Sequence, residues 1–255
     1  MANDRGRNLP LSLSRQMVGD LLALSQRIPL ANGERRIDVS PLRAAVAAAR
    51  PRPTWLPLVL KAYSIVAAAR PALRRLYVRR PWPHLYEHLE NVGAVAISRK
   101  LNGEDALFGL PIVTPEKRSI REIEKMIAEA RERPLAEIPA FRRQLRLARF
   151  PGPLRRLIYE WGMNWTGRLR VRLLGTFGMS VLASMGAATI STWVPQTTMI
   201  HYTPFADDGS MFLRIVLDHR VFDGLEGAFA LRETEEVLNT QILEEVKTMG
   251  RTKAA

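Results

Sequence analysis

Few side chains of this protein are suited to acid–base or nucleophilic chemistry. Its 255 residues include no Cys and four His, which are His84, His88, His201 and His219. Without Cys there is no disulfide, no thiolate metal site and no Cys nucleophile, so such chemistry must use oxygen or imidazole groups. A reducing compartment fits this composition.

His219 has the most informative surroundings of the four. It ends an apolar run and stands in the segment DHRVFDG (218–224), where a buried strand meets a turn. A general base must be held in one tautomer and aimed into a cleft, and a turn that brings Asp223 and Gly224 behind the imidazole can do this. The alternatives are a hydrogen-bonded structural histidine and an Asp223 that only caps the helix that follows.

The other histidines and the common phosphate or zinc motifs give weaker signals. His84 and His88 stand four apart and could pair on a metal with Glu87 or Glu90, but Pro81 and Pro83 beside them favour a solvated loop or helix face. His201 lies in an apolar run and is read as structural. No GxxxxGK[ST], GxGxxG or HExxH pattern occurs, so nucleotide phosphates and zinc hydrolysis have no motif support, and no metal is expected.

A second segment, GTFGMSVL (175–182) followed by Gly186, lies upstream of the His219 segment. Together the two resemble the GTFTISNLGxxG block and the HxxxDG signature, in its form DHRxxDG, of the dihydrolipoamide acyltransferase catalytic domain and of its relative chloramphenicol acetyltransferase. They occur in the order found in that family. Weaker likeness in residues 9–29, 36–45 and 90–98 extends the resemblance over roughly residues 9–245.

The resemblance implies a fold and a set of site residues. The fold is α/β, a mixed sheet flanked by helices, assembled as a homotrimer or a multiple of trimers with active sites at the subunit interfaces. His219 matches the general base, and Ser180 matches the hydroxyl that hydrogen-bonds the tetrahedral oxyanion from the neighbouring subunit. Asp223 matches the carboxylate that fixes the loop, often by pairing with an Arg near the N-terminal helix, for which Arg15 is the expected partner, and Gly224 completes the motif.

The resemblance also implies a reaction. An acyl group moves from a coenzyme A thioester to a thiol, hydroxyl or amine acceptor. No acyl-enzyme is expected, because the base activates the acceptor directly. Coenzyme A is then a substrate, and no tightly bound cofactor is expected. Ser180 as an ordinary strand serine is the alternative at that position.

Several features depart from the family and leave a second function open. Gly178-Met179 replaces Thr-Ile, Ala183 replaces a Gly, and the stretch from Ser180 to His219 is shorter than usual. No counterpart of the lipoyl and subunit-binding domains of the lipoamide enzymes is expected within these 255 residues. The alternative function is therefore a catalytically inactive trimeric scaffold or membrane-associated interaction module.

Positive charge is concentrated in one part of the chain. The formal net charge is +13 and the isoelectric point is about 10.9, while residues 142–172 hold nine Arg and one acidic residue, Glu160. This stretch belongs to a basic, Arg-rich insert at about 134–172. Three interpretations stay open: a solvated basic face, an anionic membrane surface contacted with Trp161 and Trp165, and docking of an acidic carrier protein or of coenzyme A phosphates through Arg142–Arg172. Nucleic-acid binding is not expected, because the sequence shows no motif of a nucleic-acid-binding fold.

The chain is expected to form one catalytic domain. We predict a flexible N-terminal arm (1–8), the acyltransferase domain (9–249) and a C-terminal tail (250–255). The N-terminus lacks the apolar core of a secretory signal, and the longest uncharged stretch, 173–206, contains Thr, Ser, Gly and two Pro, so it predicts buried strands. A cytoplasmic enzyme is expected, with a peripheral contact to a membrane as the further option.

Hydrophobic periodicity predicts the elements that must position these residues. Helices are predicted at 11–28, at 42–50 with Ser40 as N-cap, and at 55–69, 119–133 and 225–249. Strands are predicted at 37–39, 91–98, 106–113 and in the runs TFGMSVL, TTMIHYT and SMFLRIVLDH. Asn102-Gly103 predicts a turn, and Pro151-Gly152-Pro153 divides the insert into two short segments.

Overall fold

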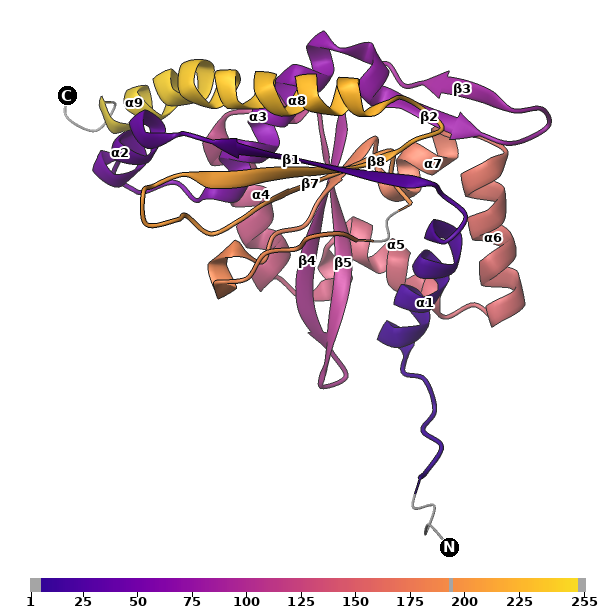
Figure 1. The fold of residues 1–255 in the computed structure, drawn as a ribbon. Coiled ribbons are helices and arrows are strands. Elements are labelled where there is room, and N and C mark those ends of the chain that lie inside the picture. The colour runs from indigo at the N-terminus through magenta and orange to yellow at the C-terminus, as the bar shows by residue number, and fades with distance from the viewer. Residues whose placement is uncertain (1–5, 193–194, 252–255) are drawn as a thin grey trace, which may run out of the picture.

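A computed structural model describes residues 6–192 and 195–251 and shows a mixed sheet flanked by helices (Figure 1). The predicted N-terminal arm (1–8) and C-terminal tail (250–255) lie partly outside the described residues. The strands are β1 (Leu30–Ile37), β2 (Arg75–Val78), β3 (His84–Glu87), β4 (Val92–Leu101), β5 (Glu104–Val113), β6 (Phe177–Met179), β7 (Thr198–Tyr202) and β8 (Met211–Asp218). The helices are α1 (Leu13–Ser25), α2 (Ser40–Ala48), α3 (Trp55–Ala69), α4 (Ile120–Glu132), α5 (Pro139–Ala148), α6 (Gly152–Asn164), α7 (Gly167–Leu174), α8 (Gly224–Val237) and α9 (Leu243–Arg251).

Six of the strands form one twisted sheet. Their order is β1-β8-β7-β6-β4-β5, in which β6 runs parallel to β4 and β7 and every other neighbouring pair is antiparallel. The twist is large enough that β4 and β5 cross the direction of β1 and β8 in Figure 1. Strands β2 and β3 form a separate hairpin.

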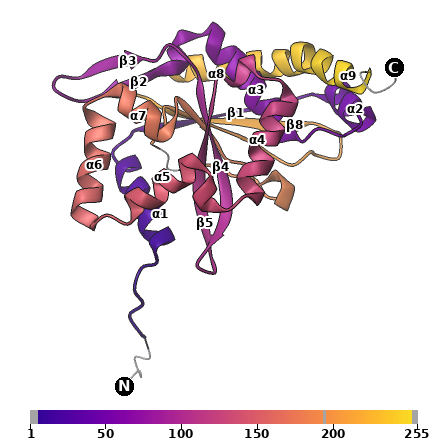
Figure 2. The same ribbon diagram turned by 180° about the vertical axis from the view of Figure 1, so that it is seen from behind.

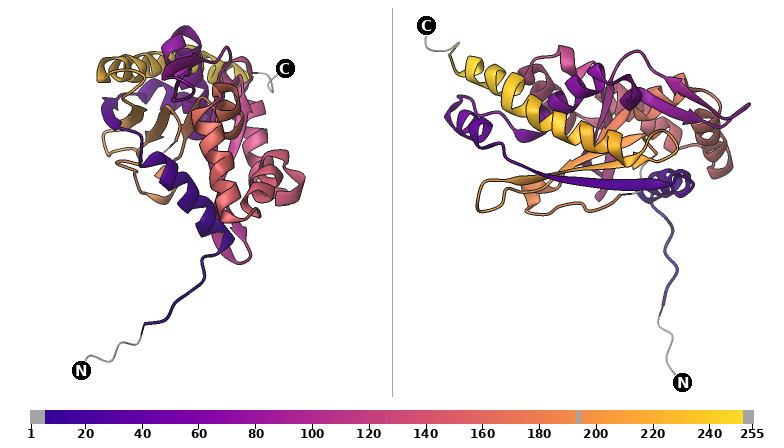
Figure 3. Two further views of the ribbon diagram at one scale, coloured as in Figure 1. Left: turned by 90° about the vertical axis from the view of Figure 1, so that its right-hand side faces the viewer. Right: turned by 45° about the horizontal axis from the view of Figure 1, so that its top comes forward.

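Helices cover one face of the sheet. Helices α3 and α8 pack against each other and α8 contacts β1 and β8, while Figure 2 shows α4 and α5 in front of β4 and β5. Figure 3 shows the continuous α8–α9 rod, joined by a π-helical turn at Leu238–Ile242, lying across the top of the sheet. Helix α3 is apolar nearly all round because it is buried between these layers, where the Tyr63 hydroxyl donates to Thr198 Oγ1 at 2.9 Å.

Most predicted elements are confirmed, since their local patterns are strong. Helix α3 has the predicted bounds, and Ser119 caps α4 through a reciprocal capping box with Glu122. The Asn102-Gly103 turn joins β4 to β5 with both φ angles positive, 53° and 86°, as a type I′ hairpin requires.

Three predictions are wrong in extent. The strand predicted at 37–39 is β1, which spans Leu30–Ile37 and forms because all eight residues pair with β8, although its sequence shows no alternation. The run TFGMSVL gives a strand of only three residues, β6, because the chain then leaves the sheet. The insert forms three helices, α5 to α7, since a further helix begins after the Thr166 N-cap.

A buried ion pair fastens the insert to the rest of the fold. Arg155 of α6 donates through Nε to Asp20 of α1, and its Nη1 donates to the carbonyls of Ala148 at 2.9 Å and Phe150 at 3.1 Å. Both charged side chains are only 6% exposed. Pairing is required at such a site because an isolated buried charge costs several kcal/mol.

We expect Arg155→Met to lower the free energy of unfolding by about 3 kcal/mol, because it removes the close partner of the buried Asp20 and leaves only the exposed Arg156, whose Nε lies 3.9 Å from Asp20 Oδ1. Urea titration followed by circular dichroism measures this. The exposed Arg143→Met is the control and should change stability by less than about 0.5 kcal/mol. Equal effects of the two variants would contradict a structural role for the ion pair.

Candidate active site

His219 leaves the sheet directly after β8 with its imidazole half exposed. Its backbone N–H donates to the Pro29 carbonyl at 2.9 Å, and the Val221 N–H donates to the Asp218 carbonyl at 3.0 Å, so the turn is held at both ends. Nδ1 of His219 lies 3.4 Å from Oδ1 of Asp223, and the two side chains are 48% and 88% exposed. The carboxylate therefore faces Nδ1, and Nε2 is the ring nitrogen without this contact.

Asp223 occupies the N-cap position of α8 but does not act as a cap. Helix α8 begins at Gly224, and the Asp223 side chain accepts no hydrogen bond from the first turn. The Asp223 carboxylate therefore makes no capping hydrogen bond and lies near His219 instead.

Asp218, immediately before His219, is fully buried and held by arginines. Arg220 binds it in bidentate fashion, with Nε 2.9 Å from Oδ1 and Nη2 2.7 Å from Oδ2, and the guanidinium stacks 4.4 Å from the ring centroid of Tyr77. The Arg220 N–H donates to Oδ1 of the same carboxylate at 3.1 Å. The backbone on both sides of His219 is thus fixed by charge-assisted hydrogen bonds.

Arg170 of α7 completes this cluster and was not singled out by sequence. Only 1% exposed, it donates through Nη1 to the Tyr77 carbonyl at 2.7 Å and through Nη2 to the Pro195 carbonyl at 2.8 Å, with Nη2 4.0 Å from Oδ2 of Asp218. Burial, opposed in part by Asp218, lowers the pKa of Arg170 to about 10. No pattern in RLRVRL separates this buried arginine from its exposed neighbours.

Ser180 follows β6 and is held by its backbone. Its N–H donates to the Ile200 carbonyl at 3.3 Å, and its carbonyl accepts from His201 Nδ1 at 2.6 Å. Across the described part of the chain its hydroxyl has no hydrogen-bond partner, so the donor is available. Gly175 of the same segment has φ +81°, and a Cβ there would lie 2.5 Å from the Val92 carbonyl oxygen, so this turn requires glycine.

His201 is a positioning residue for this backbone. Its prediction as a structural histidine is confirmed by the hydrogen bond to the Ser180 carbonyl and by its 2% exposure. Burial is the main cause that lowers its pKa, and nearby Arg214 acts in the same direction. Neutral His201 therefore donates from Nδ1, while its buried Nε2 has no partner among residues 6–192 and 195–251.

Ser180 and His219 do not meet within one chain. His201, next to Ser180 in the sheet, pairs with Arg214 of β8, four residues before Asp218. At 3.4 Å per residue those four residues span about 14 Å along the strand, and β7 lies between β6 and β8. One copy therefore presents the histidine and the serine at opposite ends of the strands.

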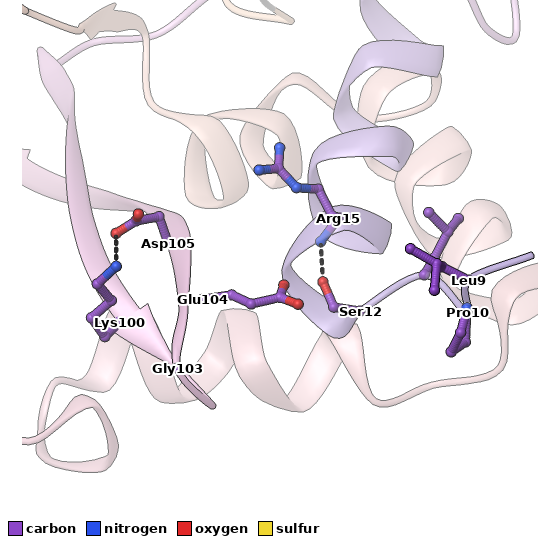
Figure 4. A pocket seen from close by; sticks show the side chains of 9 residues that line it. Leu9, Pro10, Ser12, Arg15, Lys100, Gly103, Glu104 and Asp105 are labelled. Carbon is purple, nitrogen blue, oxygen red and sulfur yellow. Dashed lines mark hydrogen bonds and ion pairs between the residues drawn. The ribbon is translucent and has the colours of Figure 1, made fainter. Parts of the chain in front are cut away.

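Arg15 is not the partner of Asp223 within the chain. Figure 4 shows it on the first turns of α1, in a pocket of about 380 Å³ with Ser12, Lys100 and Glu104 beside the β4–β5 turn. Figure 1 places this end of α1 away from the start of α8. The expected Arg15–Asp223 pair is absent from the described residues, where the ion-pair partner of Asp223 is His219.

Gly224 and the remaining histidines have simpler surroundings. A Cβ at Gly224 would meet no atom within 4 Å, so packing within one chain does not require glycine there. His84 lies on β3, which corrects the expected loop or helix, because β2 pairs with it. Within the described ranges, no group of three or more His, Asp or Glu could hold a metal ion, and no helix is long and apolar enough to cross a membrane.

The basic segment is only partly a solvated face. Arg155 and Arg170 are buried, whereas the other arginines between 142 and 172 are exposed: Arg142, Arg143, Arg146, Arg149, Arg156, Arg168 and Arg172. On α6 the side chains of Leu157 and Trp161 are 63% and 49% exposed, and Trp161 stacks on Trp165 with ring centroids 4.7 Å apart.

Comparison with known proteins places this architecture. No protein-family model and no curated protein matches the chain. Among solved structures, the dihydrolipoamide acetyltransferase of Azotobacter vinelandii matches with a TM-score of 0.69 at 17% identity, over 94% of this chain and 95% of that one. The cubic core of a pyruvate dehydrogenase multienzyme complex matches with a TM-score of 0.67 at 18% identity, over 94% and 96%. The chain has the fold of the dihydrolipoamide acetyltransferase catalytic cores.

Chloramphenicol acetyltransferase shares this acetyltransferase fold more distantly. It matches with a TM-score of 0.51 at 12% identity, over 91% of this chain and all of that one. The α/β fold class predicted from the two motif segments, a chloramphenicol-acetyltransferase-like mixed sheet, is therefore confirmed. In the acetyltransferase fold of this chain, the His219 and Ser180 segments follow the strands β8 and β6.

The buried His201 predicts a pH dependence of stability. Its folded pKa lies below the unfolded value of about 6.5, so below that pH the unfolded chain takes up a proton that the folded chain does not. We expect the free energy of unfolding to fall as the pH drops from 6.5, by at most about 1.4 kcal/mol per pH unit from this group. Urea titrations between pH 5.5 and 7.5 measure the slope, and an equal slope in His201→Gln would contradict this origin.

Proposed function

We propose that the protein is an acyltransferase that moves an acyl group from a coenzyme A thioester to a thiol, hydroxyl or amine. The observation that carries this proposal is the exposed His219 with Asp223 at its Nδ1, on a loop fixed by the buried Asp218. The Azotobacter enzyme supports it, because its structure was studied for the role of a serine, a histidine and an asparagine in its catalytic mechanism. That histidine and asparagine stand four residues apart, as His219 and Asp223 do.

In the proposed reaction, Nε2 of His219 takes the proton of the acceptor as its heteroatom attacks the thioester carbonyl. Asp223 stabilises the imidazolium that forms. The negative charge on the carbonyl oxygen of the tetrahedral intermediate accepts a hydrogen bond from the Ser180 hydroxyl. Collapse of the intermediate breaks the carbon–sulfur bond, and the leaving thiolate takes the proton from His219. The thioester is already activated, so the proposal includes no resident cofactor.

The separation of Ser180 from His219 supports a site shared between copies of the chain. Since one chain keeps them apart along the strands, the serine hydroxyl must come from a neighbouring subunit if both act on one substrate. One solved structure with this fold, from a pyruvate dehydrogenase multienzyme complex, is a cubic core. We therefore propose a homotrimer, or a multiple of trimers, located in the cytoplasm.

The exposed part of the basic segment has a proposed partner class. Seven exposed arginines together with exposed Leu157 and Trp161 fit an anionic surface, either an acidic carrier protein or anionic lipid headgroups. This contact stays a prediction. Nucleic acid is not proposed as a partner, since the fold is that of acetyltransferase cores.

We expect thiol release from acyl-coenzyme A to depend on His219. A panel of short to long acyl chains is tested with dihydrolipoamide and with simple hydroxyl and amine acceptors. His219→Ala should lower kcat/KM about 10²- to 10⁴-fold, and Ser180→Ala about 10²- to 10³-fold. His84→Ala, an exposed histidine outside the proposed site, is the matched control. Equal rates for wild type and His219→Ala, or turnover of no thioester, would favour the inactive-scaffold alternative.

Co-assembly of the two inactive variants tests the shared site. In trimers formed from equal amounts of His219→Ala and Ser180→Ala chains, about one quarter of the interfaces join an intact histidine to an intact serine. Activity should therefore recover to about a quarter of the wild-type value. If both groups acted within one chain, the mixture would stay inactive, and the shared site would be wrong.

A further inference from the structure

A pocket of about 230 Å³ lies beside the His219 loop and is lined by arginines. It sits between the end of α1, strand β2 and helices α6 and α7, which adjoin one another in Figure 1. Its charged lining consists of Arg27, Arg79, Arg170, Arg220 and Glu160. Two of these arginines, Arg170 and Arg220, are the ones that hold Asp218.

The charges around this pocket do not balance. Glu160 lies 3.6 Å from Arg27, and Asp218 is shared by Arg220 and Arg170. Arg79 is exposed and has no ion-pair partner in the part of the chain that the structure describes. The four arginines of the pocket therefore carry two positive charges more than Glu160 and Asp218 neutralise. On its Arg170 side the pocket reaches the buried interior.

Arg170 supplies the second, independent observation. Its side chain is 1% exposed, and its buried Nε has no hydrogen-bond partner among the described residues. A buried cation with an unsatisfied donor is costly, and an anion in the pocket relieves both the excess charge and the desolvation. Guanidinium N–H groups donate charge-assisted hydrogen bonds to phosphate oxygens, so several guanidinium groups around one cavity favour that chemistry.

We propose that this pocket binds a phosphate-type dianion. The two unbalanced positive charges match the charge of a phosphate or phosphomonoester, and the volume is several times the roughly 30 Å³ of a water molecule in the liquid. A bound anion contacts the arginines that fix Asp218, and so it steadies the backbone from which His219 emerges. This site goes beyond acyl transfer and does not depend on it.

The test is calorimetric titration of the full chain with inorganic phosphate at constant ionic strength, in the wild type and in His219→Ala. Saturable binding at one site per chain is expected in both, so the result does not rely on turnover. Arg79→Met should weaken binding about tenfold, because it removes one charge-assisted contact from an exposed position without altering the fold. Arg149→Met, an equal charge change at an exposed position outside the pocket, should leave the affinity unchanged.

Two further titrations identify the source of the phosphate group. Adenosine 3′-phosphate represents a nucleotide, and glycerol 3-phosphate represents a lipid headgroup. The compound that binds more tightly indicates the class of ligand. If Arg79→Met loses affinity for either of these two ligands, this supports binding in the proposed pocket. The proposal is overturned if phosphate shows no saturable binding, or if Arg149→Met weakens it as much as Arg79→Met does.

Discussion

Asp218 brings a negative charge into the interior at the end of β8, and much of the surrounding structure is arranged to neutralise it. An unpaired buried carboxylate costs several kcal/mol, so Arg220 binds it from the same turn and Arg170 approaches from α7. These arginines in turn reach the ring and the carbonyl of Tyr77 on β2 and the Pro195 carbonyl. Four segments distant in sequence thus meet at one carboxylate, and His219 leaves the sheet from this fixed point.

The basic insert is part of the same framework. Its charge suggests a solvated surface, yet Arg155 joins α6 to α1 through Asp20, and Arg170 joins α7 to the His219 turn. Two arginines are thus used to connect the insert with the core. The other arginines of residues 142–172 are exposed to solvent, where they can meet anionic partners. The arginine-lined pocket lies where the insert and the core join.

The sheet also explains why one copy of the chain keeps Ser180 and His219 apart. Strand β6 runs parallel to β7, and β8 returns antiparallel, so the residues that follow β6 and β8 emerge at opposite ends. Ser180 and His219 follow these two strands. The backbone contact from His201 fixes the first and the Asp218 cluster fixes the second, so neither can move toward the other without loss of buried hydrogen bonds.

The sequence by itself determined the features that depend on local pattern. The apolar run of α3, the capping box of α4 and the Asn102-Gly103 turn each follow from neighbouring residues, and the two motif segments indicated the fold and the candidate residues His219, Ser180 and Asp223. Other features were decided only by tertiary structure. Strand β1 exists because β8 pairs with it, and burial of Arg170 and His201 is set by residues far away in the chain, which no local spacing records. The expected Arg15–Asp223 pair is not made within one chain, because helix spacing does not fix which end of α1 lies near α8.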